Sequence, residues 1–254
     1  MEKNNEIIQV DNVTLGYGET VILEDISFRV RRGERFVILG GSGCGKSTLM
    51  KHMIGLYPVM RGDIMISGMS IVRADEADRQ TIFQKIGVMY QSGALFGSMT
   101  LIDNVALPLE VQTELPREII EAMAQSKLKL VGLGGFEHFM PADLSGGMKK
   151  RAAIARAMAL DPDIIFLDEP SAGLDPVTAA ELDQTIIKLS DSLRITFVVV
   201  THELESIYTI AENVIFLDDR TKGIIAQGDP RELKKSSDNE YVRNFFNRQV
   251  MIPV

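Results

Sequence analysis

Short apolar runs separated by turn residues dominate the first part of the chain. Between residues 6 and 40, two segments of alternating apolar and polar positions precede a near-continuous apolar run, RFVILG. Turn residues at 16–19 and 31–34 divide these segments, so we predict an antiparallel layer over 6–40. Because RFVILG has almost no polar position, this last strand should be buried on both faces. A helix over roughly 46–54 and a strand pair over 63–71 should follow.

The rest of the chain changes its periodicity. Helical periodicity around 116–130 and an Ala-rich run from Ser145 predict a helical subdomain over 98–160. After it, apolar runs alternate with helical patterns, which is typical of a parallel sheet wrapped by helices. The expected strands are 164–167, 195–200 and 213–219, and the expected helices are 177–192 and a segment from Glu203.

These patterns predict one α/β domain over residues 1–254. Its catalytic core should comprise 1–97 and 161–235, with the helical subdomain inserted between them. The tail, 236–254, should form helical segments that end in an apolar tip. The sequence leaves open whether this tail packs on its own core or on a neighbouring subunit.

Composition limits the location and the partners. No apolar run reaches the roughly 18–20 residues that a membrane-spanning helix needs, and the first ten residues lack a signal-peptide core. We therefore expect a cytosolic protein that reaches a membrane only through a partner. The net charge of −8 gives no overall basic footprint for nucleic acid, and the single cysteine excludes an intrachain disulfide.

A glycine-rich loop follows RFVILG and precedes the first expected helix. Its sequence, GGSGCGKST, fits the phosphate-loop pattern G-x-x-x-x-G-K-[ST] in the context that the pattern requires. The glycines let backbone N–H groups surround phosphates at a helix N-terminus. Lys46 would supply a positive charge to the β/γ-phosphates, and Ser47 would be a ligand of Mg²⁺. The expected nucleotide contacts are Gly40, Gly41, Ser42, Gly43, Cys44, Gly45, Lys46, Ser47 and Thr48.

Two adjacent carboxylates end the apolar strand IIFL. In a parallel sheet this strand end lies beside the phosphate loop. Asp168 is therefore a candidate to act on Mg²⁺, and Glu169 is a candidate general base for the attacking water. The alternative is a pair of solvated carboxylates at a strand end. The phosphate loop upstream favours the catalytic interpretation.

A second glycine-rich helix start, the signature segment, reads LSGGMKKR at 144–151. Ser145 fits the N-cap position, and Gly146 and Gly147 leave backbone donors open to an anion. The basic residues of the next turns oppose the helix dipole, which a nearby phosphate would offset. Taken alone, the segment fits equally well a capped surface helix whose basic turn faces solvent.

The order and spacing of these motifs resemble the nucleotide-binding subunits of ABC transporters over essentially the whole chain. The resemblance rests on the phosphate loop, LSGGM at 144–148, FLDEP at 166–170, GLD at 173–175 and the histidine His202. It implies a P-loop NTPase fold with a RecA-like parallel-sheet core, an antiparallel β subdomain and the inserted α-helical subdomain. It also implies ATP and Mg²⁺ as cofactors.

The resemblance assigns roles to single residues. Tyr17 would stack on adenine, Gln91 would contact the Mg²⁺ region and sense the membrane partner, and His202 would hold the γ-phosphate. Asp175 would couple the two sites of a homodimer, in which residues 145–147 contact the ATP of the other copy. The implied catalytic residues are Glu169, His202, Lys46 and Gln91, and the implied metal ligands are Ser47, Gln91 and Asp168.

Two segments resemble a narrower family, the ATPases of Mla-type, MCE-associated phospholipid transporters of double-membraned bacteria. They are QSGALFGSMTLIDNVALPL at 91–109 and a signature with Met148 where the wider family has glutamine. This resemblance implies a peripheral location on the cytoplasmic face of the inner membrane. The implied partners are a permease that docks near Gln91 and residues 92–109, an MCE-type lipid-binding protein and a small regulatory subunit, but no nucleic acid.

Two other functions stay open at this point. A soluble ABC ATPase acting on DNA or ribosomes is disfavoured by the single cassette, the lack of sustained heptads and the acidic charge. Transport of another cargo is disfavoured only by the narrower resemblance. Cys44 lies at a helix N-terminus, where a thiol pKa is lowered, so we predict that alkylation blocks ATP hydrolysis and that bound ATP protects.

Overall fold

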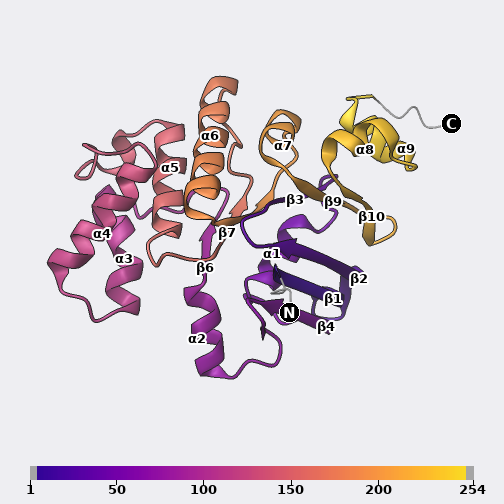
Figure 1. Ribbon diagram of the computed structural model, residues 1–254, viewed down its shortest axis with the longest axis horizontal. Coiled ribbons are helices and arrows are strands. Elements are labelled where there is room, and N and C mark those ends of the chain that lie inside the picture. The colour runs from indigo at the N-terminus through magenta and orange to yellow at the C-terminus, as the bar shows by residue number, and fades with distance from the viewer. Residues whose placement is uncertain (1–4, 250–254) are drawn as a thin grey trace.

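The computed structural model describes residues 5–249 and arranges them around two β-sheets (Figure 1). The smaller sheet is antiparallel, in the order β2-β1-β4-β5. Its strands are β1 (Glu6–Tyr17), β2 (Thr20–Arg31), β4 (Arg61–Ile66) and β5 (Met69–Ser70). The prediction of an antiparallel layer is therefore confirmed for the first two segments, and so is the strand pair expected at 63–71.

The larger sheet has six strands in the order β10-β9-β3-β8-β7-β6. They are β3 (Arg35–Gly40), β6 (Ile86–Met89), β7 (Ile164–Asp168), β8 (Thr196–Val200), β9 (Asn213–Asp218) and β10 (Gly223–Gly228). Neighbouring strands are parallel except β10, which pairs antiparallel with β9. Placing RFVILG in the antiparallel layer was wrong, because a strand with two apolar faces needs cover on both sides.

Helices surround this sheet, with α3 to α5 gathered at one end of the molecule and α8 and α9 near the other (Figure 1). They are α1 (Lys46–Met53), α2 (Glu76–Gln84), α3 (Leu101–Gln112), α4 (Arg117–Leu130), α5 (Gly146–Ala157), α6 (Pro176–Leu193), α7 (Leu204–Ile210), α8 (Pro230–Ser236) and α9 (Glu240–Phe246). The expected apolar tip of the tail lies outside the described residues. Within 5–249, every helix is too short or too polar to cross a membrane.

Two apolar clusters cover the two faces of the larger sheet. Val37 and Leu39 of β3 belong to the cluster that contains the apolar faces of α3 to α6. Phe36 and Ile38, which alternate with them, belong to the cluster shared with the antiparallel sheet. This alternation follows the period of two along a strand. The packing fixes the carboxyl ends of β3, β7 and β8 side by side, where the predicted site residues begin.

Candidate functional site

The glycine-rich loop between β3 and α1 lines a cavity of about 610 Å³. Gly40 leaves β3 at φ 147°, and a Cβ there would lie 2.4 Å from the Leu217 carbonyl oxygen and from the Cys44 sulfur. Lys46 Nζ donates to the carbonyl oxygens of Gly40 (3.0 Å) and Gly41 (2.8 Å). The loop thus brings an ammonium group and a helix N-terminus together, as anion binding requires. The lining residues are Ile22, Gly40, Gly41, Ser42, Gly43, Gly45, Lys46, Ser47, Thr48, Gln91, Glu169, His202 and Phe245.

Two oxygen-bearing side chains, Ser47 and Asp168, are paired at this cavity. The Ser47 hydroxyl donates to Asp168 Oδ1 at 3.1 Å. Burial raises the pKa of Asp168, the Ser47 hydrogen bond opposes that effect, and the charge of Glu169 adds to it. Residues 5–249 contain no group of three His, Cys, Asp or Glu side chains that could hold a metal by themselves. The pair fits Mg²⁺, which takes few protein carboxylates and fills its shell with phosphate oxygens and water.

Glu169 follows β7 in a left-handed backbone conformation, with φ 47°. Its N–H donates to the Val200 carbonyl oxygen at 2.8 Å, which helps to hold a geometry that costs roughly 1–3 kcal/mol. The Glu169 side chain is only 12% exposed, and its Oε1 lies 2.7 Å from His202 Nδ1. Its buried Oε2 has no hydrogen-bond partner among the described residues. One oxygen is therefore oriented by a histidine, and the other is buried with its hydrogen-bonding capacity unused.

Gln91 reaches the same cavity from the loop after β6. The group that holds this loop was missed by sequence reasoning: Lys150 of α5, whose buried Nζ donates to the Gln91 carbonyl oxygen at 2.5 Å. Burial lowers the pKa of Lys150, and the Glu169 and Asp168 carboxylates oppose that effect. The helical period could have revealed it, because Lys150 shares a buried face of α5 with residues 147 and 154.

The signature segment is not among the residues described as lining this cavity. Ser145 caps α5 by accepting from the Met148 N–H at 3.3 Å, and Ser145 and Gly146 are exposed. Gly147 is buried, and a Cβ there would lie 2.3 Å from Thr178 Cγ2 of α6. Asp175 caps α6, and the hydrogen bonds from Thr178 lower the pKa of Asp175. Within one chain, the two glycine-rich helix starts therefore stay separate.

Two aromatic residues differ in their relation to this cavity. Tyr17 packs edge-on against Tyr57, with ring centroids 5.1 Å apart, and is not among the residues described as lining the cavity. Phe245 of α9 does line it. In the same helix, the Tyr241 hydroxyl oxygen lies 3.2 Å from where a Cβ on Gly41 would stand. The start of the predicted tail thus packs on its own core beside the phosphate loop.

The expectation for Cys44 needs correction. Its thiol is 2% exposed, and burial raises the pKa of Cys44 although the charge of Lys46 opposes this. Desolvation disfavours the thiolate more than the helix N-terminus favours it. The side chain packs beneath the loop, so we now expect slow alkylation even without nucleotide.

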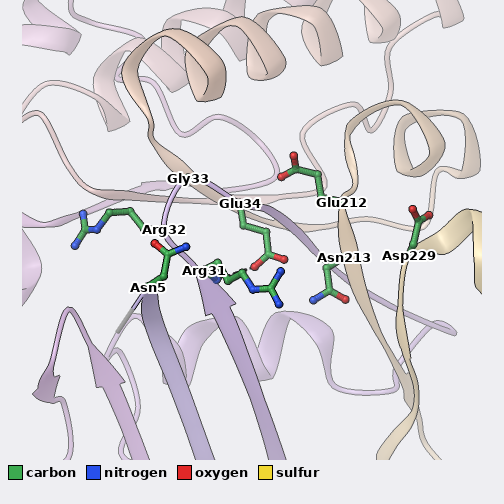
Figure 2. Close-up of a pocket in the computed structure, with 8 residues that line it drawn as sticks. All are labelled: Asn5, Arg31, Arg32, Gly33, Glu34, Glu212, Asn213 and Asp229. Atoms are coloured by element: carbon green, nitrogen blue, oxygen red, sulfur yellow. Dashed lines mark hydrogen bonds between the residues drawn. The ribbon is translucent and has the colours of Figure 1, made fainter. Parts of the chain in front are cut away.

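A second cavity, of about 410 Å³, lies at the opposite end of β3 (Figure 2). Residues of both charges line it, among them Arg31, Glu34 and Glu212. The Arg31 N–H donates to Glu34 Oε2 at 2.7 Å, so the buried carboxylate is already satisfied locally. Ligands of open α/β sheets bind at the carboxyl ends of the strands. The cavity at the phosphate loop is therefore the functional candidate.

Comparison with known proteins agrees with this geometry. The profile of the family described as ABC transporter matches residues 23–172, which hold the phosphate loop, the signature and both carboxylates. The chain belongs to the ABC transporter family. The intermembrane phospholipid transport system ATP-binding protein MlaF of Haemophilus influenzae is 38% identical to this chain. The match covers 94% of this chain and 90% of the length of MlaF. The probable ribonucleotide transport ATP-binding protein mkl of Mycobacterium tuberculosis is 41% identical to this chain. The match covers 97% of this chain and 68% of the length of mkl.

Solved structures of ABC cassettes share the fold. For cbiO1 from Clostridium perfringens, part of the ABC transporter complex cbiONQ, the TM-score is 0.84 at 28% identity, over 96% of each chain. For the dimeric cassette MJ0796 bound to ADP and Pi, the TM-score is 0.77 at 31% identity. The match covers 87% of this chain and 98% of the MJ0796 chain. The predicted ABC-cassette fold is confirmed, and the protein is an ATP-binding ABC ATPase. The roles of single residues and the boundaries of the subdomains stay predictions.

Proposed function

We propose that this ABC ATPase drives phospholipid transport between bacterial membranes as a homodimer beneath a separate permease. The likeness to MlaF over nearly the whole of both chains supports the cargo class. The observation that carries the dimer is the exposed pair Ser145 and Gly146, whose donors face solvent while the phosphate loop lies elsewhere in the same chain. In this arrangement the ATPase sits on the cytoplasmic face of the inner membrane.

In the proposed site, ATP lies between the phosphate loop of one copy and residues 145–147 of the other. Lys46 exchanges its two carbonyl partners for the β- and γ-phosphates. Ser47 and Asp168 would hold Mg²⁺, with Gln91 beside them, and the ion would supply positive charge next to the phosphates. Asp175, at the start of α6, links the two sites, and Tyr17 stacks on the adenine.

Glu169 is the proposed general base, oriented by His202, which also contacts the γ-phosphate. We expect Glu169→Gln to bind ATP normally, because the substitution preserves shape and leaves the phosphate loop intact. Turnover should fall roughly 10²–10⁴-fold, the usual contribution of a general base. Binding of a fluorescent ATP analogue and release of phosphate measure the two effects separately. Near wild-type turnover in this variant would remove Glu169 from the role.

A groove of about 390 Å³ beside Gln91 suits a short helix of the permease. Its apolar residues Leu56 and Phe83 are 54% and 40% exposed, and an amphipathic helix buries such side chains in a groove. The groove adds segments before Gln91 to the proposed docking surface near Gln91 and residues 92–109. Its lining residues are Ile54, Gly55, Leu56, Arg79, Phe83, Ile86, Val88 and Tyr90.

A second cargo remains a candidate because of the 41% identical relative named for ribonucleotide transport. Purification of the complex from detergent-solubilised membranes, followed by lipid and nucleotide analysis, distinguishes the cargoes. We expect a permease, an MCE-type lipid-binding protein, a small regulatory subunit and bound phospholipid. A complex with permease but with ribonucleotide in place of lipid would support the second cargo. Recovery without any permease would refute both.

A further inference from the structure

Two cations of α5 hold the loop that carries Gln91. Lys150 Nζ donates to the Gln91 carbonyl oxygen at 2.5 Å. Farther along the helix, the Arg156 guanidinium donates to the carbonyl oxygens of Gly93 (2.9 Å) and Ala94 (2.7 Å). We call Lys150 and Arg156 the α5 clamp. The clamp ties three backbone carbonyls of one loop to the helix that opens at the signature segment.

In the α5 clamp, Lys150 is buried and Arg156 is partly buried. Lys150 is 8% exposed, and burial lowers the pKa of Lys150 and of Arg156. Neither forms an ion pair with the carboxylates of the described residues. Desolvating a cation is unfavourable unless its donors are used. The loop carbonyls are the groups that use them, so these contacts are a built feature and not a chance approach.

Lys150 also reaches the strand that carries the proposed base. Its Nζ lies 3.5 Å from the Glu169 carbonyl oxygen, at the long limit of a hydrogen bond. Gln91 and Glu169 both line the nucleotide cavity, whereas Lys150 is not among its lining residues. The Lys150 ammonium group therefore contacts the backbone of two site residues from outside the cavity. Lys150 belongs to α5, the helix that begins at the signature segment.

We propose that Lys150 is a positioning residue that holds Gln91 and Glu169 in register with the signature helix. This inference rests on the proposed roles of Gln91 and Glu169. Because Lys150 makes no contact with the phosphate loop, its loss should spare ATP binding. It should slow the chemical step, since misplacing a reacting group by about 1 Å reduces the rate by roughly 100-fold.

The variant Lys150→Met keeps the length of the side chain and removes its donors. We expect kcat for ATP hydrolysis to fall roughly 10- to 100-fold, with KM for ATP changed less than about threefold. Hydrogen exchange of residues 91–96 should accelerate, while exchange in α1 and β7 stays unchanged. Lys150→Arg, which restores charged donors, should recover most of the turnover.

The control is Lys188→Met, because Lys188 is an exposed lysine of α6, outside the signature segment, whose side chain makes no hydrogen bond or ion pair with residues 5–249. Its kcat should stay within about twofold of the wild type. The proposal is overturned if Lys150→Met keeps its kcat, or if both variants lose the same fraction. If Lys150→Met does not fold, Lys150→Gln is measured by the same criteria.

Glu169→Gln is assayed in parallel so that two failures stay distinct. Normal turnover in Glu169→Gln would show that Glu169 is not the base. The hydrogen exchange of residues 91–96 in Lys150→Met would still test the α5 clamp by itself. Unchanged exchange of 91–96 in Lys150→Met removes the α5 clamp, whatever Glu169→Gln does.

Discussion

The phosphate loop and the signature segment are both glycine-rich helix starts, yet their surroundings differ. At the phosphate loop, side chains from α1 and from the ends of β7 and β8 converge on one cavity, with Lys46, Glu169 and His202 in its lining. At the signature, Ser145 accepts a hydrogen bond within its own helix, and Gly146 faces solvent. The first region gathers a cation, the oxygen pair of Ser47 and Asp168, and the Glu169 carboxylate. The signature segment offers only hydrogen-bond donors at a helix N-terminus.

The difference teaches that a helix N-terminus becomes a site through the groups gathered around it. A helix dipole and bare N–H groups contribute about 1 kcal/mol at an exposed end, which is too little to bind a nucleotide alone. The signature can therefore act only when another molecule brings the phosphate to it. The following predictions test this division of labour between the two regions.

The largest expected effects come from one substitution in each region. Lys46→Ala should weaken ATP binding to a single protomer by roughly 10- to 100-fold, because a charge-assisted hydrogen bond to phosphate is lost. Gly146→Asp should leave that affinity within about twofold and reduce hydrolysis by about 100-fold or more, since a carboxylate would face the partner's γ-phosphate. Aspartate in a first helical turn is compatible with the dipole, so folding should be preserved. Equilibrium binding and phosphate release measure the two quantities.

Mixing these two inactive variants sharpens the test. In the proposed symmetric dimer, each site would join one chain's phosphate loop to the other's signature segment. A mixed dimer therefore keeps one intact site, and random pairing should restore about a quarter of wild-type turnover. Lys46→Ala mixed with Glu169→Gln is the control, because both substitutions lie on the phosphate-loop side and no site is intact. Activity in the control mixture, or none in the first, would contradict the shared site.

The sequence predicted those parts of the site that are formed by contiguous residues. The phosphate loop, the strand before it and the carboxylate pair at the end of β7 were all predicted, because strand, turn and helix signals there fall within a few positions of one another. The predicted helices over 46–54 and 177–192 were likewise close to α1 and α6. Local periodicity and capping determine such elements.

What escaped prediction depends on approach between distant parts of the chain. Lys150 and Gln91 are 59 positions apart, and nothing in a basic helix turn states which carbonyl it will meet. Phe245 reaches the nucleotide cavity only because α9 packs on Phe216, with ring centroids 4.9 Å apart. Strand β6 has four residues, IGVM, and no charged or polar side chain among them. Its pairing with β7, and not its own sequence, therefore defines it.

The two regions also differ in how they bury a carboxylate. Asp168, beside the phosphate loop, accepts a hydrogen bond from Ser47. Asp183 lies on α6, the helix that supports the signature, and its buried Oδ1 has no partner among the described residues. Burial raises the pKa of Asp183 from 3.8 to about 6, although Ser206 opposes the effect. At about 1.4 kcal/mol per pKa unit, ionised Asp183 costs about 3 kcal/mol.

The sign of this effect fixes the test. A carboxyl whose pKa rises on folding favours the folded state below its unfolded pKa, and that advantage is lost as pH rises through about 6. Asp183→Asn should therefore raise the free energy of unfolding at pH 8 by up to about 3 kcal/mol, and by less at pH 4.5. Urea unfolding at both pH values measures it. An equal change at the two pH values would show that ionisation is not the cause.

The smallest expected effect returns to the phosphate-loop side and concerns Phe245. A flat ring in the cavity wall can contact a bound nucleotide, and an aromatic contact contributes about 0.5–1.5 kcal/mol beyond burial. Phe245→Leu keeps an apolar side chain against Phe216 and should weaken ATP binding roughly two- to tenfold.

The neighbouring ring provides the matched control for this substitution. Phe246 also lies near Phe216, with centroids 6.3 Å apart, but is buried and is not among the described lining residues. Phe246→Leu should lower stability without changing ATP affinity. If both variants weaken binding equally, α9 acts only by supporting the loop through Tyr241. If Phe245→Leu alone weakens binding, α9 contributes directly to the nucleotide site at the phosphate loop. One chain then supplies every part of that site except the signature segment, which comes from its partner.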